Sequence, residues 1–173
     1  MKRMEHEINE WKRIKRKRHE TNEWKRIKRK KTNGTKMILH KELSYQIIGA
    51  VYNTRKIYGP GQKEIVYQRG LAEELKENNI PYKREVNINI ISPKSGRILS
   101  NYRVDFVIKE RVILELKSLK FLPQKMEQQL YSYLRSTPYE VGYLINMGGP
   151  EINIKRVILT NDRKPYLHLF RVR

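Results

Sequence analysis

The chain contains no cysteine among its 173 residues. This absence excludes disulfide frameworks, thiolate zinc sites, iron–sulfur clusters and cysteine nucleophiles, and it fits a reducing compartment. Only four histidines are present, and His40 and His168 have no close histidine or acidic neighbour at the spacing of zinc ligands. No apolar run approaches the roughly 18 residues of a membrane span, and the amino terminus lacks the apolar segment of a signal peptide. We therefore expect a cytoplasmic protein that does not enter the membrane.

Acidic residues are scarce beside basic ones. The chain has 38 Lys and Arg against 18 Asp and Glu, which gives a net charge of +20. Residues 1–36 hold 15 of the basic and 5 of the acidic residues, so a fifth of the chain carries half of the net charge. The remainder is also basic. The charge predicts binding to a polyanion, for which we expect nucleic acid, with an anionic membrane surface as the competing partner.

The first 36 residues contain a duplication. HEINEWKRIKRKR at 6–18 and HETNEWKRIKRKK at 19–31 agree at 11 of 13 positions. On a helix, a shift of 13 residues places Trp11 and Trp24 about 140° apart, so the repeat forms no common apolar stripe. Each copy offers too little apolar surface to offset chain entropy. We expect a disordered or transiently helical extension over 1–36, either a basic arm that binds phosphates or a solvated segment without a role, followed by one domain over 37–173.

From residue 37 onward, apolar residues first recur every three or four positions, as in a helix. They then recur at every second position, as in a strand, before the helical spacing returns. This pattern predicts an α/β domain in which three antiparallel strands form a meander between helices. The predicted helices cover 39–58, 62–78 and 124–137. The predicted strands cover 86–90, 102–108, 112–116, 141–147 and 152–160, with a sixth possible strand over 166–172.

Two of these strands predict their own register. The apolar residues of the strands 102–108 and 112–116 share a face only if the numbers of two facing residues add up to an even value. A three-residue turn at 109–111 gives such a register. Phe106 then pairs with Leu114, and Val104 with Leu116. On the opposite surface, the same register brings the carboxylates of Asp105 and Glu115 together.

Adjacent carboxylates repel, and a divalent cation between them relieves the repulsion. Two acidic oxygens with water suit Mg²⁺ or Mn²⁺. Lys117 lies two residues beyond Glu115 and projects to the same side, where it can orient a water molecule. The alternative is a polar outer sheet face with an ordinary contact between Glu115 and Lys117, and the bare spacing favours this simpler interpretation.

Asp105 followed by Glu115-Leu116-Lys117, with helices before and after, resembles the αβββαβ core of the PD-(D/E)xK nuclease superfamily. The stretch GQKEIVY at 61–67 resembles the GxxExxY motif that names a bacterial branch of it. Further similar stretches are ELSYQIIGA at 42–50, NYRVDFVI at 101–108, QLYSYLRST at 129–137 and YLINMGG at 143–149. The resemblance implies a restriction-endonuclease-like fold, with a central mixed sheet flanked by helices.

The resemblance also implies a metal site. Asp105 and Glu115 would hold Mg²⁺ or Mn²⁺, with the backbone carbonyl of Leu116 as a further candidate ligand. Lys117 would position the nucleophilic water, and Glu64 would supply an additional acid from a helix.

Other residues match supporting motifs of the family. Gly61 and Tyr67 complete the GxxExxY motif around the helix acid. Gln129 and Tyr133, four apart and on one helix face, resemble a QxxxY element that supports the site and contacts DNA. One departure is that Arg103-Val104 precedes Asp105, where the superfamily's first motif has a proline.

Three functions follow from these observations. The first is a metal-dependent phosphodiester hydrolase, a nuclease acting on nucleic acid, for which we expect DNA. The second is a nucleic-acid-binding module that retains the nuclease fold with weak or no catalysis. The third is an adaptor that binds a membrane surface or a protein partner through the basic extension.

Overall fold

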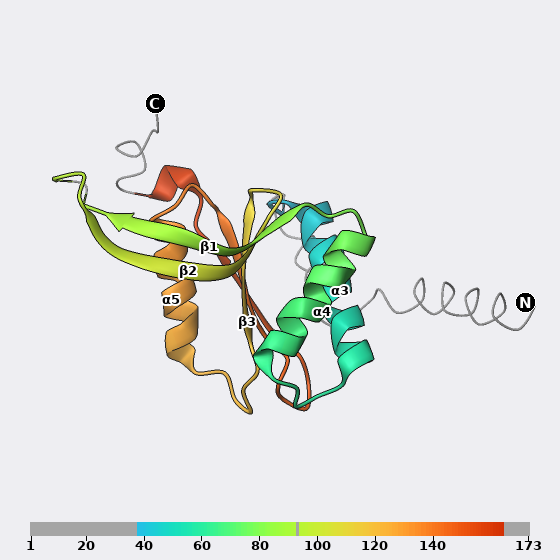
Figure 1. Cartoon of the computed structure of the whole chain (residues 1–173). Coiled ribbons are helices and arrows are strands. Elements are labelled where there is room, and N and C mark those ends of the chain that lie inside the picture. Colours follow the sequence, from blue (N-terminus) through green and yellow to red (C-terminus); the bar gives the residue numbers. More distant parts are fainter. Residues whose placement is uncertain (1–37, 93, 165–173) are drawn as a thin grey trace, which may run out of the picture. The chain divides into compact units, whose positions relative to one another are not determined.

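The computed structural model describes residues 38–92 and 94–164 (Figure 1). The chain divides into two units, Met1–Tyr45 and Gln46–Arg173, and the second contains the whole sheet. The duplicated extension and the possible strand over 166–172 lie outside the described residues. The predicted boundary between residues 36 and 37 therefore stays a prediction.

Three α-helices and five strands form the described part of the chain, which confirms the predicted α/β fold. Two strands of the predicted meander begin earlier than their alternating patterns indicate. The first begins at Tyr82 rather than 86, and the second at Ile98 rather than 102, because the two pair with each other over almost their whole length. The elements are α3 Lys41–Tyr58, α4 Glu64–Glu77, β1 Tyr82–Ile91, β2 Ile98–Ile108, β3 Val112–Lys117, α5 Gln124–Arg135, β4 Val141–Asn146, β5 Asn153–Ile158 and a 3₁₀ turn, Asn161–Arg163.

The sheet is mixed, with the strand order β1-β2-β3-β4-β5. Strands β3 and β4 are parallel, whereas the other neighbouring pairs are antiparallel. A parallel pair needs a crossover, which α5 provides. Phe106 pairs with Leu114 and Ile108 with Val112, so the predicted three-residue turn is confirmed. The ladder ends at Phe106, however, so the predicted pair between Val104 and Leu116 lies beyond its hydrogen-bonded part.

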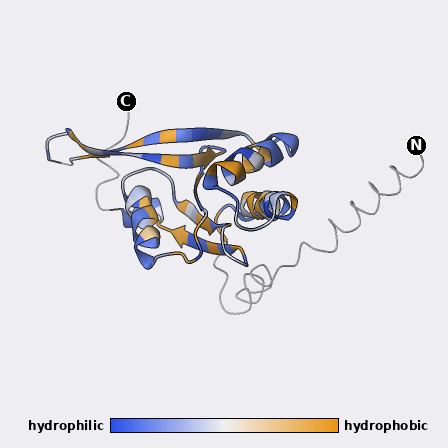
Figure 2. Ribbon diagram, turned by 60° about the horizontal axis from the view of Figure 1, so that its bottom comes forward, coloured by the Kyte–Doolittle hydropathy of each residue, from blue (hydrophilic) through white to orange (hydrophobic). Residues whose placement is uncertain are grey.

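Helices cover both faces of the sheet. Helix α4 packs against β3 on one side, while α5 packs against β4 and β5 on the other (Figure 1). Consequently every residue from Val112 to Leu116 is buried. The hydropathy colours of Figure 2 show alternation along β1 and β2, in agreement with their half-exposed burial pattern. The alternative of a polar outer face is therefore wrong for Glu115, because the strand that carries it is buried on both faces, whereas Asp105 is half-buried.

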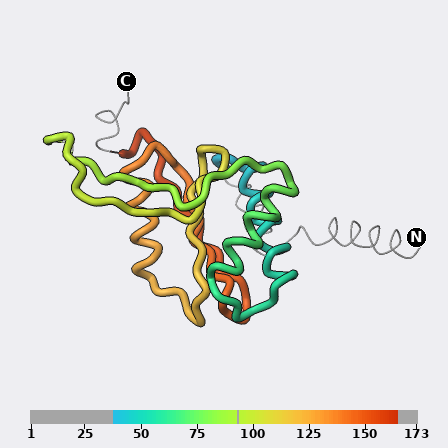
Figure 3. The backbone as a smooth tube through the Cα atoms, viewed as in Figure 1, coloured from blue at the N-terminus to red at the C-terminus, as the bar shows by residue number. Residues whose placement is uncertain are grey.

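Strands β1 and β2 continue well beyond the part of the sheet that pairs with β3 (Figure 3). The far end of this hairpin exposes the large apolar side chains of Ile98 and Leu99. Among the described residues, no helix is long and apolar enough to cross a membrane.

Candidate active site

Asp105 lies where the backbone pairing of β2 is interrupted on both sides. In the β1–β2 ladder, Arg84 pairs with Phe106 and Val86 with Val104, which leaves Glu85 unpaired between them. Glu85 has a φ of 51°, a left-handed conformation that costs free energy for a residue with a side chain. The interruption frees the edge of β2 at the one position in this strand that carries a carboxylate.

The Asp105 carboxylate takes the place of a β2 backbone carbonyl as the acceptor for an N–H of β3. Its Oδ2 accepts a hydrogen bond of 2.7 Å from the backbone N–H of Leu116. This contact explains why the β2–β3 ladder stops at Phe106. It also orients the carboxylate, because a hydrogen bond from a fixed backbone amide leaves the side chain little rotational freedom.

Lys117 connects the acid on β3 with the acid at the start of α4. Its Nζ lies 3.4 Å from Glu115 Oε2 and 3.7 Å from Glu64 Oε1. The predicted placement of Lys117 on the side of Glu115 is therefore found. Glu115 is only 8% exposed, so the attraction between Lys117 and Glu115 is stronger than that of an ion pair on the surface.

Gln68 links Asp105 to Glu64, although it belongs to none of the sequence motifs described above. Its Nε2 donates to Asp105 Oδ1 at 3.0 Å and to Glu64 Oε1 at 3.4 Å. The sequence did hold a signal, because Gln68 follows Glu64 by four residues and lies on the same helix face. Hydrogen bonds and ion pairs thus link Glu64 at the start of α4 with Asp105 on β2 and with Glu115 and Lys117 on β3.

Burial and mutual repulsion perturb the acids. Burial, followed by the charge of Asp105, raises the pKa of the Glu115 carboxyl to about 8. Burial also raises the pKa of Asp105. For Lys117, burial lowers the pKa, but Glu115, Asp105 and Glu64 outweigh it and the net pKa is raised. Both carboxyls therefore hold a proton more readily than free carboxyls do, whereas Lys117 keeps its charge.

The donor atoms suit a divalent cation. Glu115 Oε1 is buried and has no hydrogen-bond partner, which is costly for a carboxylate oxygen and is relieved by a cation. Carboxylate oxygens are the ligands that Mg²⁺ and Mn²⁺ prefer. Within the described ranges, no group of three or more His, Cys, Asp or Glu side chains is assembled for a metal. The side-chain donors are therefore the pair Asp105 and Glu115, while Lys117 and Gln68 engage Glu64.

Helix α5 contributes Tyr133. This side chain is 4% exposed and its ring centroid lies 5.1 Å from that of Tyr102 on β2. Burial, followed by the charge of Glu115, raises the pKa of the Tyr133 hydroxyl to about 12. The hydroxyl also receives a hydrogen bond from Gln129, which is exposed. Tyr133 thus lies within electrostatic reach of the acids, whereas Gln129 is exposed to solvent.

Gly61 and Tyr67 shape the turn that leads into α4. The buried Tyr67 hydroxyl donates to the carbonyl of Gly59 at 2.7 Å and accepts from the backbone N–H of Gln62 at 3.2 Å. Gly61 adopts a φ of 77°, which glycine tolerates and other residues rarely do. The glycine and the tyrosine thus fix the point at which the helix begins, and Glu64 is its first residue.

Comparison with known families matches residues 41–157 to the PD-(D/E)XK nuclease superfamily. The chain belongs to this superfamily. Its mixed sheet with a helix on each face agrees with a restriction-endonuclease-like core. No curated protein matches the chain.

Among solved structures, the chain is similar to one described as "Crystal structure of SSO0001". The two share 23% sequence identity with a TM-score of 0.43 over 75% of this chain. The chain spans 64% of the length of that structure.

Proposed function

We propose that this superfamily member is a metal-dependent phosphodiester hydrolase that acts on nucleic acid, with DNA as the first expected substrate. We also assign it to the GxxExxY branch, because Gly61, Glu64 and Tyr67 occupy the positions of that motif. The observation that carries the proposal is the contact of Lys117 with the buried Glu115, whose second carboxylate oxygen, Oε1, has no hydrogen-bond partner. The basic composition supports a polyanionic substrate.

The carboxylates of Asp105 and Glu115 would hold Mg²⁺ or Mn²⁺, with the carbonyl of Leu116 as a further donor. When bound, the ion would stabilise negative charge that develops on the scissile phosphate. Asp105 is already oriented for this role by the N–H of Leu116 and the amide of Gln68.

Lys117 would orient the attacking water. Its raised pKa keeps the ammonium protonated, so it acts as a hydrogen-bond donor at a position 3.4 Å from Glu115 Oε2. Glu64, on the other side of the ammonium, holds it in place and is the additional acid of the site. Tyr133 would shield the acids from solvent, and Gln129 would contact the nucleic acid.

The decisive experiment compares cleavage by the wild type with cleavage by Asp105→Asn, which keeps the shape and removes the charge. We expect Mg²⁺-dependent cleavage of labelled DNA to fall at least about 100-fold, since even outer partners of metal ligands are worth about 10–100-fold. Glu110→Gln, an exposed glutamate outside the site, is the control and should leave the rate unchanged. Cleavage that persists in Asp105→Asn, or in chelator, would contradict the proposal.

A second function is favoured by one observation. Glu64 is engaged by Lys117 and Gln68, so only two acids among the described residues are available as metal donors. In a binding module that retains the fold, Glu64 would stay engaged by Lys117 and Gln68 whether or not Mg²⁺ is present. It predicts salt-sensitive binding to DNA that is indifferent to chelator and to Lys117→Ala, with no cleavage in Mg²⁺ or Mn²⁺.

A further inference from the structure

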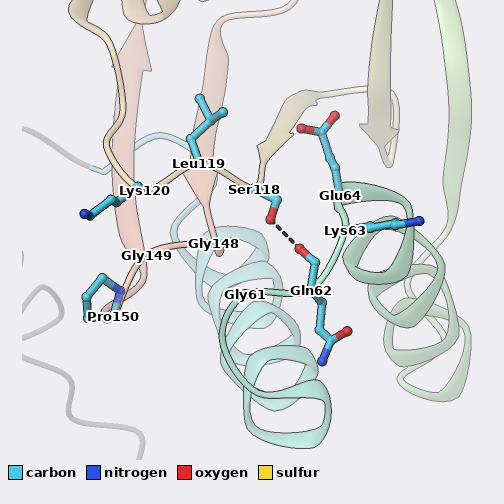
Figure 4. Close-up of a pocket in the computed structure, with 10 residues that line it drawn as sticks. All are labelled: Gly61, Gln62, Lys63, Glu64, Ser118, Leu119, Lys120, Gly148, Gly149 and Pro150. Atoms are coloured by element: carbon cyan, nitrogen blue, oxygen red, sulfur yellow. Dashed lines mark hydrogen bonds between the residues drawn. The ribbon is translucent and has the colours of Figure 1, made fainter.

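A cleft of about 450 Å³ opens beside the acids (Figure 4). Three segments line it: 61–64 before and at the start of α4, 118–120 after β3, and 148–150 after β4. Glu64 belongs both to this lining and to the acid cluster. The cleft therefore adjoins the candidate active site at Glu64.

Hydrogen bonds hold the three lining segments together. The Ser118 hydroxyl donates to the carbonyl of Gln62. The Asn146 side chain accepts from the N–H of Leu119 and donates to its carbonyl, each at 2.8 Å. Arg55 donates to the carbonyl of Gly149 at 2.6 Å. Because each of these contacts ties a side chain to a backbone atom of a lining segment, the walls are organised before any ligand enters.

Close backbone contact defines the floor between two of the segments. A Cβ on Gly148 would lie 2.5 Å from the carbonyl carbon of Ser118 and 2.6 Å from the N–H nitrogen of Leu119. The glycine thus allows the strand ends of β3 and β4 to approach each other. The cleft depends on a specific residue type at this point and is not simply a gap between loops.

Two lysines line the cleft, and an exposed aromatic ring directly follows one of them in the sequence. The side chains of Lys63 and Lys120 belong to its lining and extend in opposite directions in Figure 4. Next to Lys120, Phe121 is 76% exposed and has its ring centroid 5.6 Å from the Lys120 Nζ. Cations combined with an exposed aromatic face are the features with which proteins bind single-stranded nucleic acid.

We propose that this cleft binds an unpaired nucleotide adjacent to the scissile phosphate, with Phe121 stacking on a base and Lys63 and Lys120 contacting the flanking phosphates. The preferred substrate is therefore a single strand or a single-stranded end. This inference rests on the proposed function, because the cleft is placed relative to the acids. Its volume falls in the range of about 300–1,000 Å³ typical of small-molecule sites, which suits one nucleotide and not a duplex. Within a duplex, the faces of the bases are already stacked and unavailable to Phe121.

The experiment uses the full chain in chelator, so that no turnover is needed. An oligonucleotide carrying 2-aminopurine is titrated with protein as a single strand and as a duplex, and both anisotropy and 2-aminopurine fluorescence are recorded. We expect tighter binding of the single strand and quenching of the fluorescent base on stacking. Phe121→Leu should abolish the quenching and weaken binding about tenfold, whereas Phe121→Trp should retain both.

Tyr131→Leu removes another exposed aromatic ring, on α5, and serves as the matched control; it should change neither signal. Equal affinities for single strand and duplex, or quenching that survives in Phe121→Leu, would overturn the inference. Stacking on Trp11 or Trp24 of the extension would produce that second result. Because the measurement is made without cleavage, it separates failure of this inference from failure of the proposed hydrolysis, which only the Mg²⁺-dependent rate reports.

Discussion

Replacing Glu115 with glutamine tests whether the buried carboxylate destabilises the protein when no cation is bound. Burial and the charge of Asp105 raise the pKa of Glu115 to about 8 in the folded protein, from an ordinary value of 4.5. Below pH 4.5 the carboxyl is neutral in both states. Between pH 4.5 and 8 the unfolded chain ionises first, so the free energy of unfolding falls as pH rises through this window.

The magnitude follows from this interval. Each pH unit in the window changes the free energy of unfolding by about 1.4 kcal/mol, so the wild type should lose roughly 3–5 kcal/mol by pH 8 because of this one group. Glutamine has nearly the same shape and cannot ionise. The variant should therefore lack this part of the pH dependence and exceed the wild type in stability at pH 8.5, while the two differ little at pH 5.

Urea unfolding in chelator, followed by circular dichroism at pH 5, 7 and 8.5, measures this difference. Mg²⁺ should raise the stability of the wild type at pH 8.5 and leave Glu115→Gln nearly unaffected, because binding to the folded state stabilises it. Glu110→Gln is the control, since Glu110 is exposed beside Lys83 and its pKa is lowered, not raised. Parallel pH profiles for the wild type and Glu115→Gln would refute the reasoning.

Two further variants test the residues around the acids. Gln68→Leu should weaken Mg²⁺ binding about tenfold in calorimetric titration, because Asp105 loses the amide that orients it. The control is Gln128→Leu, which changes an exposed glutamine on α5 and should bind Mg²⁺ as the wild type does. Equal Mg²⁺ affinities of the two variants would contradict this role of Gln68. Tyr67→Phe should lower the free energy of unfolding by about 1–2 kcal/mol in urea, because two backbone groups of the turn before α4 lose their partner. The exposed Tyr131→Phe should change nothing, and an equal loss there would point to a different cause.

The placement of Asp105 and Glu115 on neighbouring strands could be predicted from the sequence because it depends on local information. Alternating apolar residues define the faces of β2 and β3, and the length of the turn between them defines the register. Both signals lie within residues 102–117, so no knowledge of distant packing was needed. Lys117 follows from the same alternation.

The bridge made by Gln68 depends on information that is not local. Helix α4 must dock against β3 before an amide at this position can reach Asp105, and the docking arises from apolar packing around residues such as Leu71 and Leu75. The interruptions of the β1–β2 and β2–β3 ladders could not be predicted from the sequence either. Nothing in the alternating pattern of β1 marks Glu85 for a positive φ, and the early end of the β2–β3 ladder results from the hydrogen bond that Asp105 takes over.

The charge of the whole chain and the charge of the site act in opposite directions on a nucleic acid. The net charge of +20 attracts the polyanion, but at the site the three acids Glu64, Asp105 and Glu115 all act on the single cation of Lys117. A phosphate that approaches these acids is repelled unless a proton on Glu115 or a divalent cation reduces their charge. Metal and substrate should therefore strengthen each other's binding at the site, and this coupling is reciprocal by thermodynamic necessity. Binding through the basic surface elsewhere would show no such coupling, so the dependence of oligonucleotide affinity on Mg²⁺ separates the site from the rest of the molecule.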